Sequence, residues 1–338
     1  HTRIHFHFCC TITRLKVCAK TSASSNPSCF DGAGRLIIDL HRPPNFIFDN
    51  LKLTLSYLYK FCKNFGNLII KKMITKIIDK NDYYARIKEL NVSHYSGEVP
   101  YYIQASLRQV EKKILASIFK GSRILDVGCS SGRFSIGTAQ TGHDVTGLDI
   151  TSEAIIAASN KAKNLKLDNI RFLVGDMINM PFNDNEFDYV FCPRFSINAV
   201  ATFQRRQKAI QEMVRVVKPG GVVYVESFNR FYLGRGLFFL LKNIFRDTFR
   251  TSVIMLCWIF RKQYTGLLPC DIIYKSNKVA SASKGYAHLP TIFELKKLTP
   301  ANISKKFYSI PQIVNECSID PFKYFRYSIW TLLTKPKN

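Results

Sequence analysis

The alternation of strand-like and helix-like segments between residues 122 and 227 is the feature that most constrains the fold of this chain. Five short runs rich in Val, Ile and Leu are separated by segments with helical periodicity or by a polar loop. These runs read RILDVG, HDVTGLD, IRFLVGD, FDYVFC and GGVVYVES. Because strands separated by helices pair in parallel through crossover connections, we predict an α/β fold with a doubly wound sheet.

The last residue of each predicted strand is informative, because a ligand of an open parallel sheet binds beyond the carboxyl ends of the strands. The first strand ends at Asp126 and continues into a loop that contains Gly128 and Gly132. The second strand ends at Asp149, which lies 21 residues after Gly128, and the third ends at Asp176. A carboxylate about 20 residues after a glycine loop suits the two hydroxyls of a ribose.

The loop DVGCSSG (residues 126–132) lacks the GxGxxG spacing of dinucleotide-binding proteins. A carboxylate at Asp126 would repel a pyrophosphate but attract the ammonium group of an amino acid. A ligand that combines adenosine with an amino-acid end is S-adenosylmethionine. The strand ends therefore favour this molecule over a nicotinamide dinucleotide.

With these residues in view, the sequence resembles the class I S-adenosylmethionine-dependent methyltransferases. ILDVGCSSGRF, VTGLDI, GDMINMPFNDNEFDYVFC and VVKPGG are similar to the motifs of that family, in the same order and at the same spacing. The resemblance implies a Rossmann-like sheet of parallel strands with an antiparallel last strand. It also implies S-adenosyl-L-methionine as cofactor, and since the cofactor supplies its own leaving group, we expect no metal.

The resemblance implies roles for particular residues. Asp149 would bind the ribose hydroxyls, Asp176 would accept from the adenine amino group, and Cys192 would lie near the reacting methyl group. The full set of implied cofactor-binding residues is Asp126, Gly128, Cys129, Gly132, Asp149, Ile150, Asp176, Met177 and Cys192. One departure from the family pattern is Ser130, where many members carry glycine. Another is the segment CPRFSINAV, where many members carry histidine.

The catalytic base stays unassigned at this level, because methyl transfer depends mainly on positioning the acceptor in line with the methyl group. The candidates are His94, Tyr95, Arg194 and His288. For His94 and His288 we favour a buried histidine with structural partners over a catalytic role. The planar guanidinium of Arg194 could instead pair with a carboxylate or phosphate of the substrate.

Residues 228–290, which we call the cap, interrupt the alternation and hold ten Lys/Arg against two Asp/Glu. We expect a helical insertion after the fifth strand, with an apolar and a cationic stripe. The apolar stripe is Leu237, Leu241, Phe245 and Phe249, and the cationic stripe is Lys242, Arg246 and Arg250. Such a cap could cover a hydrophobic or anionic substrate, could touch an anionic membrane surface, or could use its stripes to pack onto the core.

The first methionine is Met73, and the 72 residues before it contain 11 Lys/Arg and 3 Asp/Glu without a signal-peptide pattern. We expect translation to begin at Met73 and residues 1–72 to be a non-native or poorly ordered extension. The remaining predicted parts are an N-terminal helical segment at 73–121, a cofactor-binding core at 122–227, the cap, and a C-terminal helix with strands at 291–338 that complete the core.

The formal charge of +25 fits an acidic partner and fits a solvated basic surface equally well, so charge alone does not assign a partner. Our leading interpretation is methyl transfer to a small acceptor that is hydrophobic or anionic, as in the quinone-biosynthesis methyltransferases that VVKPGG resembles. The alternatives are RNA (tRNA) methylation and a non-catalytic adaptor that binds a membrane or nucleic acid. The ten cysteines form no CxxC pair, and no apolar run reaches the ~20 residues of a membrane span, so we predict a cytoplasmic protein.

Overall fold

The computed structural model describes three short strands near the amino terminus and residues 79–338, except 233, 235, 261, 276–283, 317 and 338. The chain divides into two compact units, His1–Lys72 and Met73–Asn338. In the first unit, β1 (Arg3–His5) pairs antiparallel with β2 (Ala19–Lys20) and β3 (Ile37–Asp39). The rest of residues 1–72, and with it the expectation of a poorly ordered extension, lies outside the described residues.

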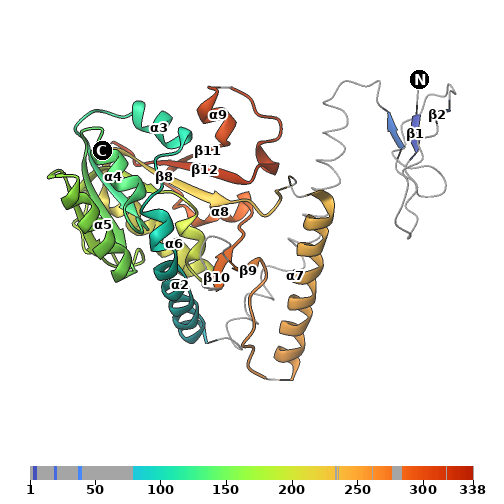
Figure 1. The fold of residues 1–338 in the computed structure, drawn as a ribbon. Helices are drawn as coiled ribbons and strands as arrows, with labels where there is room; N and C mark the ends of the chain where they lie inside the picture. Colours follow the sequence, from blue (N-terminus) through green and yellow to red (C-terminus); the bar gives the residue numbers. More distant parts are fainter. Residues whose placement is uncertain are drawn as a thin grey trace. The chain divides into compact units, whose positions relative to one another are not determined.

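The second unit is built on a seven-stranded sheet (Figure 1). Its order is β11-β12-β8-β7-β4-β5-β6. The strands are β4 (Arg123–Val127), β5 (Asp144–Asp149), β6 (Ile170–Val174), β7 (Phe187–Cys192), β8 (Val217–Phe228), β11 (Ser304–Tyr308) and β12 (Ser328–Thr334). The strands from β4 to β8 pair in parallel, and β12 runs antiparallel between β8 and β11. The predicted doubly wound sheet with an antiparallel last strand is therefore confirmed.

Both faces of the sheet are covered, which explains why the central strands are apolar at nearly every position. Leu125 of β4 packs in a core with helices α6 and α8, whereas its neighbour Ile124 packs on the opposite face with α3, α4 and α9. The covering helices are α3 (Gln109–Ala116), α4 (Arg133–Ala139), α5 (Ser152–Asn164), α6 (Phe203–Val216), α8 (Ile292–Leu298) and α9 (Ile310–Val314). Two short 3-10 turns are η1 (Ser196–Ala199) and η2 (Lys323–Phe325).

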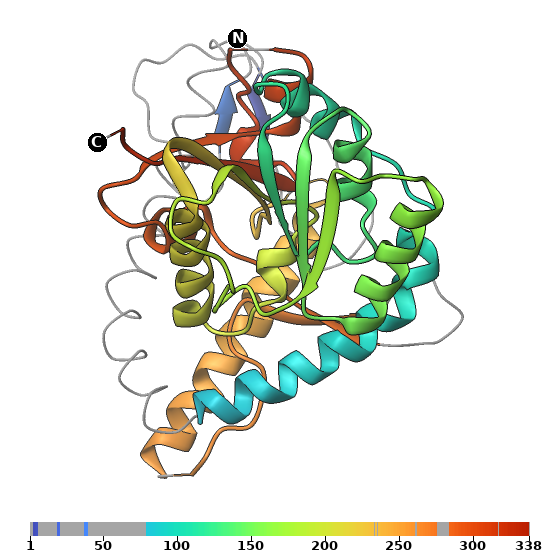
Figure 2. The ribbon, with the colours of Figure 1, turned by 90° about the vertical axis from the view of Figure 1, so that its left-hand side faces the viewer.

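Helix α2 (Lys80–Tyr102) runs across one end of the sheet, as Figure 2 shows in cyan. Its first turn is capped by Asp79, whose side chain accepts from the N–H groups of Asn81 and Asp82. The helix lies within the predicted helical segment at 73–121, of which residues 73–78 are outside the described part of the chain.

The cap contains a helix, as predicted, and also a pair of strands that the sequence interpretation missed. Helix α7 (Gly236–Ile259) joins two apolar blocks into one element of 24 residues. It is followed by β9 (Asp271–Lys275) and β10 (Lys284–His288), which pair antiparallel. A small core of Tyr83 and Ile87 from α2, Ile254 from α7 and Tyr286 from β10 holds the cap against α2. No helix among the described residues is long and apolar enough to cross a membrane.

Candidate active site

A pocket lies at the carboxyl ends of the parallel strands, where the sequence analysis expected it. Seven of the nine implied cofactor residues line it: Asp126, Gly128, Cys129, Asp149, Ile150, Asp176 and Met177. Gly132 and Cys192 are not among the lining residues. Cys192 is fully buried in the sheet core, and burial raises the pKa of its thiol far above the usual range.

The glycine loop of residues 126–132 has a backbone that only glycine adopts without strain at two positions. Gly128 has φ +74°, and a Cβ there would lie 2.5 Å from the Cβ of Ser196. Gly132 has φ +77°, and its Cβ would lie 2.9 Å from Cζ of Phe172. Ser130, the departure from the family pattern, also has a positive φ of 49°. The loop thus brings its backbone close to whatever occupies the pocket.

Asp126 carries an unpaired carboxylate oxygen in the pocket wall. Its side chain is fully buried, Oδ2 accepts from Ser135 Oγ at 2.5 Å, and Oδ1 has no hydrogen-bond partner. Burial raises the pKa of Asp126 to about 7, against the opposing effects of Ser135 and Arg133. An ammonium group beside Oδ1 would satisfy this atom and stabilise the ionised carboxylate.

Asp149, at the end of β5, is fixed by the backbone on both oxygens. Oδ2 accepts from the N–H of Ser130 at 2.8 Å, and Oδ1 accepts from the N–H of Thr151 at 2.9 Å. Burial raises the pKa of Asp149, although these N–H groups favour its ionised form. Each oxygen keeps a further lone pair, which suits the two hydroxyls of a ribose.

Asp176, just after β6, connects the sheet to helix α2. Its Oδ2 accepts from Tyr84 Oη at 2.7 Å and from Lys88 Nζ at 3.2 Å. Burial and the contact with Asp176 raise the pKa of the Tyr84 hydroxyl, so Tyr84 stays a donor. Helix α2 therefore covers the pocket beside the carboxylate that the sequence analysis assigned to adenine.

The face of α2 over the pocket is the largest part of the site that the sequence analysis missed. Only Tyr95 of its five lining residues was a candidate. The lining residues from α2 are Tyr84, Lys88, Asn91, Tyr95 and Tyr102. Their spacing of four, three, four and seven residues is a helical stripe, a signal that could have identified this face.

The loop after β7 presents Arg194 to the pocket in a strained conformation. Arg194 and Phe195 have φ values of 55° and 66°, a backbone region that non-glycine residues seldom adopt. The N–H of Arg194 donates to the buried carboxylate of Glu226 at 2.8 Å, and Arg108 binds both oxygens of Glu226. Among the described residues, the guanidinium of Arg194 forms no ion pair. The buried carboxylate of Glu226 thus holds this loop, Arg194 is one of the lining residues of the pocket, and its guanidinium lies 6.0 Å from the ring centroid of Tyr102.

The four candidate bases separate into two groups. Tyr95 and Arg194 line the pocket, whereas His94 and His288 do not. His94 is buried against the rings of Tyr95 and Tyr274, with centroids 5.2 Å away. Both ring nitrogens of His288 are engaged, Nδ1 with Asp271 at 2.6 Å and Nε2 with Glu294 at 2.9 Å.

Neither lining candidate is suited to remove a proton. Burial raises the pKa of Tyr95 well above its ordinary value, so its hydroxyl stays protonated. Arginine is permanently protonated as well. The residues around the pocket can position and stabilise an acceptor, and the described part of the chain contains no group of three His, Cys, Asp or Glu placed to hold a metal ion.

Comparison with known proteins agrees with this geometry. Residues 118–265 match a family model described as a methyltransferase domain. A demethylmenaquinone methyltransferase of Staphylococcus epidermidis is 37% identical over 110 residues, covering 32% of this chain and 43% of the relative. One from Geobacillus is 30% identical over 152 residues, covering 44% of this chain and 61% of the relative. The chain thus spans less than two thirds of these relatives.

Among solved structures, a methyltransferase of Methanosarcina mazei dependent on S-adenosylmethionine (SAM) matches with a TM-score of 0.50 at 22% identity, covering 69% of this chain and all of that one. Residues 118–265 therefore match a methyltransferase domain by sequence, and the described sheet shares its fold with that SAM-dependent enzyme.

Proposed function

We propose that the protein transfers a methyl group from SAM to a small hydrophobic acceptor that reacts as an anion, such as a quinone-type molecule. The observation that carries this proposal is the composition of the pocket. It combines three strand-end carboxylates for the cofactor with Arg194, which forms no ion pair among the described residues and whose guanidinium lies 6.0 Å from the ring of Tyr102, another lining residue. The two relatives named as demethylmenaquinone methyltransferases support an acceptor of this class.

In the proposed reaction, SAM supplies a sulfonium-activated methyl group. Asp126 holds the ammonium end through its unpaired oxygen, Asp149 accepts from the ribose hydroxyls, and Asp176 lies beside the adenine. Arg194 stabilises negative charge on the acceptor, so that an acidic hydroxyl or carbon acid gives its proton to solvent before the pocket closes and then attacks the methyl carbon as the anion, with the thioether S-adenosylhomocysteine as leaving group. Helix α2 excludes water from the pocket through the contacts of Tyr84 and Lys88 with Asp176.

RNA methylation stays the second candidate because of the charge of +25. The cover formed by α2 favours a small acceptor, because a polynucleotide needs an open basic groove to reach the methyl group. The third candidate, a non-catalytic adaptor, differs from both in that its pocket need not bind the cofactor.

The first test is calorimetry with SAM on the wild type and on Asp149→Ala. We expect binding that weakens at least about tenfold in the variant, because two ribose hydrogen bonds are lost. If the wild type does not bind SAM, both methyltransferase hypotheses are wrong and the non-catalytic adaptor is the hypothesis that stays.

The second test is transfer of a radiolabelled methyl group to demethylmenaquinone in detergent, with tRNA as competing acceptor. Arg194→Gln should lower kcat/KM about a hundredfold, a size typical of losing one charge-stabilising group. The matched control is Arg171→Gln, at a half-exposed arginine of β6 outside the pocket lining. Methylated tRNA with no methylated quinone would reject the proposed acceptor while leaving the cofactor assignment intact.

A further inference from the structure

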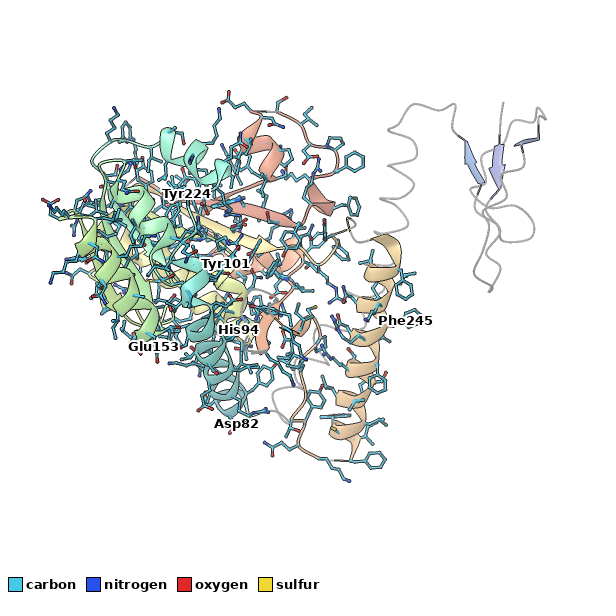
Figure 3. The ribbon with its side chains drawn as sticks, in the orientation of Figure 1. Asp82, His94, Tyr101, Glu153, Tyr224 and Phe245 are labelled. Atoms are coloured by element: carbon cyan, nitrogen blue, oxygen red, sulfur yellow. The ribbon has the colours of Figure 1, made fainter. Side chains whose placement is uncertain are left out.

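Helix α7 presents a row of large apolar side chains to solvent, whereas a surface helix ordinarily turns its apolar side chains toward the protein. The exposed fractions of Phe238, Phe245 and Phe249 are 80%, 73% and 71%. Asn243 and Asp247 are buried on the opposite side of the helix, together with Leu240 and Ile254. In Figure 3, Phe245 points away from the body formed by the sheet and its helices.

Most of the exposed apolar residues form one stripe along the helix. The stripe consists of Phe238, Leu241, Phe245, Phe249, Leu256 and Ile259, with Phe260 directly after the helix, and Ile244, Met255 and Trp258 are exposed beside it. The spacing of three, four, four, seven and three residues within the stripe keeps it on one side of the helix, whose 24 residues are about 36 Å long. An exposed apolar surface of this extent marks an interaction site.

The buried side of α7 explains why the stripe cannot simply pack inward. Asp247 pairs with Arg230 at 2.5 Å, and Arg250 Nη1 donates to the carbonyl oxygens of Leu268 and Asp271. The cationic stripe of the sequence analysis thus contributes to anchoring the helix. The interpretation that the apolar stripe packs the cap onto the core is wrong for Leu241, Phe245 and Phe249, while the side chain of Leu237 lies outside the described residues.

The charges of the cap identify the partner. Its only two acidic residues, Asp247 and Asp271, are 5% and 1% exposed. Lys242 and Lys262 are exposed at the two ends of the stripe. The outer surface of the described cap therefore carries positive charge beside apolar side chains, a combination that complements anionic headgroups above acyl chains.

We propose that α7 docks the cap on the surface of an anionic lipid bilayer, with the helix lying in the plane of the interface. A lipid surface fits better than RNA, because Leu241, Leu256 and Ile259 lie among the phenylalanines and cannot stack on bases, whereas acyl chains accommodate aliphatic and aromatic side chains alike. It also fits better than a membrane span, because no described helix is long and apolar enough to cross one. This docking depends on α7 alone and is independent of the proposed methyl transfer.

The test is co-flotation of the full chain with vesicles of phosphatidylcholine containing 30% phosphatidylglycerol. We expect binding that weakens in pure phosphatidylcholine and at high salt. Phe245→Glu with Phe249→Glu should lower vesicle affinity at least about tenfold, since two apolar anchors become anionic. The matched control is Phe119→Glu with Ile319→Glu, at side chains that are 81% and 79% exposed outside the cap, and it should bind like the wild type.

SAM calorimetry on each variant checks that the pocket is intact. Absence of vesicle binding by the wild type, or equal losses of vesicle affinity in the two double variants, would overturn the proposal.

Sedimentation velocity without lipid measures whether the protein self-associates through the same stripe. If the wild type does not bind vesicles but forms a dimer, and Phe245→Glu with Phe249→Glu makes it a monomer, the stripe serves self-association. Binding to tRNA in place of vesicles, lost in the same variant, would assign it to RNA.

Discussion

At the scale of single residues, Gly128 shows how a backbone conformation and a close contact act together. Its positive φ costs any other residue about 1–2 kcal/mol, and a Cβ would in addition clash with Ser196. Gly121 has a similar φ of 71° but nothing within 4 Å of the position of a Cβ. Comparing alanine substitutions at these two glycines therefore distinguishes the cost of backbone strain from the cost of a steric clash.

We predict that Gly128→Ala destabilises the protein more than Gly121→Ala, by about 1–3 kcal/mol, because overpacking adds to strain. Only Gly128→Ala should also weaken SAM binding, since Ser196 would have to move at the pocket. Urea unfolding measures the first effect and calorimetry the second. Equal losses of stability in the two variants would contradict the close approach of Ser196.

Asp126 gives the site a pH dependence whose sign follows from burial. Its pKa of about 7 in the folded chain exceeds its ordinary value of 3.8, so between these values the folded state binds more protons than the unfolded state. The stability of the cofactor-free protein should therefore fall as pH rises from about 4 to 7, by up to about 1.4 kcal/mol per pH unit for this group. Asp126→Asn should remove this contribution, which urea unfolding at pH 5 and pH 8 would detect.

The same carboxylate should make SAM affinity rise with pH up to about 7, because the ionised form attracts the ammonium group. Calorimetry across pH 5.5–8 should show this trend in the wild type and lose it in Asp126→Asn. A variant that binds SAM as tightly as the wild type at pH 8 would contradict the assignment of the ammonium to Asp126.

The sequence predicted the pocket residues that lie at the ends of strands. It could not predict the surroundings of residues whose burial depends on segments distant in the sequence. Asp126, Asp149 and Asp176 line the pocket because parallel strands end at one edge of the sheet. The burial of His94 and His288 depends on the cap folding over α2, which no local pattern near either residue specifies.

At the scale of elements, β10 and α8 are held together by a buried ionic network around His288. Asp271 and Glu294 contact its two ring nitrogens, Arg206 donates to Glu294, and Tyr83 donates to Asp271. Burial and Arg206 oppose the charge of His288, but Glu294 and Asp271 outweigh them and raise its pKa above 6.5. Its contribution to stability is therefore complete below about pH 6.5 and is lost as pH rises through the raised folded pKa.

We predict that His288→Gln destabilises the protein by about 3–5 kcal/mol at pH 6, since two buried carboxylates lose their shared cation. The loss should shrink at pH 9, where the wild-type imidazole is closer to neutral. Urea unfolding at both values measures it. His143 is the control with opposite sign, because burial lowers its pKa, so His143→Gln should gain relative stability as pH falls. A pH-independent loss in His288→Gln would contradict the charged network.

The elements or orientations that the sequence analysis missed are those whose hydrophobic pattern is too short to recognise or does not tell which side is buried. Strands β9 and β10 are five residues each and too short for a clear period. Helix α7 has the periodicity that was predicted, but periodicity cannot tell which side faces the protein. The side that faces inward carries the buried Leu240 and Ile254 as well as Asp247 with its arginine partners.

At the scale of the whole molecule, the fold was predictable because one alternating pattern specifies all five central parallel strands. Charge was less informative, since a formal value of +25 fits a lipid, a nucleic acid or an acidic metabolite equally well. Because both acidic residues of the cap are buried, the exposed surface of the described cap is positively charged. This burial depends on tertiary packing, which the sequence pattern does not specify.

The division of the chain at Lys72 and Met73 leads to the last prediction. Residues 73–338 contain every residue that lines the pocket, the described stripe of α7 and the three hydrophobic cores. Removing residues 1–72 takes away 11 basic and 3 acidic residues and lowers the formal charge from +25 to +17. We therefore expect 73–338 alone to bind SAM within about twofold of the full chain and to unfold at the same urea concentration, as independent domains do.

The same truncation also tests which part of the chain binds anionic vesicles. If α7 is the anchor, 73–338 should keep most of its affinity for anionic vesicles and should still lose it on Phe245→Glu with Phe249→Glu. If the basic residues before Met73 were the anchor instead, affinity would fall by about the contribution of several lysines, each near 1 kcal/mol at an anionic surface. A truncated chain that binds SAM normally but ignores vesicles would move the membrane contact from α7 to residues 1–72 and leave the methyltransferase assignment untouched.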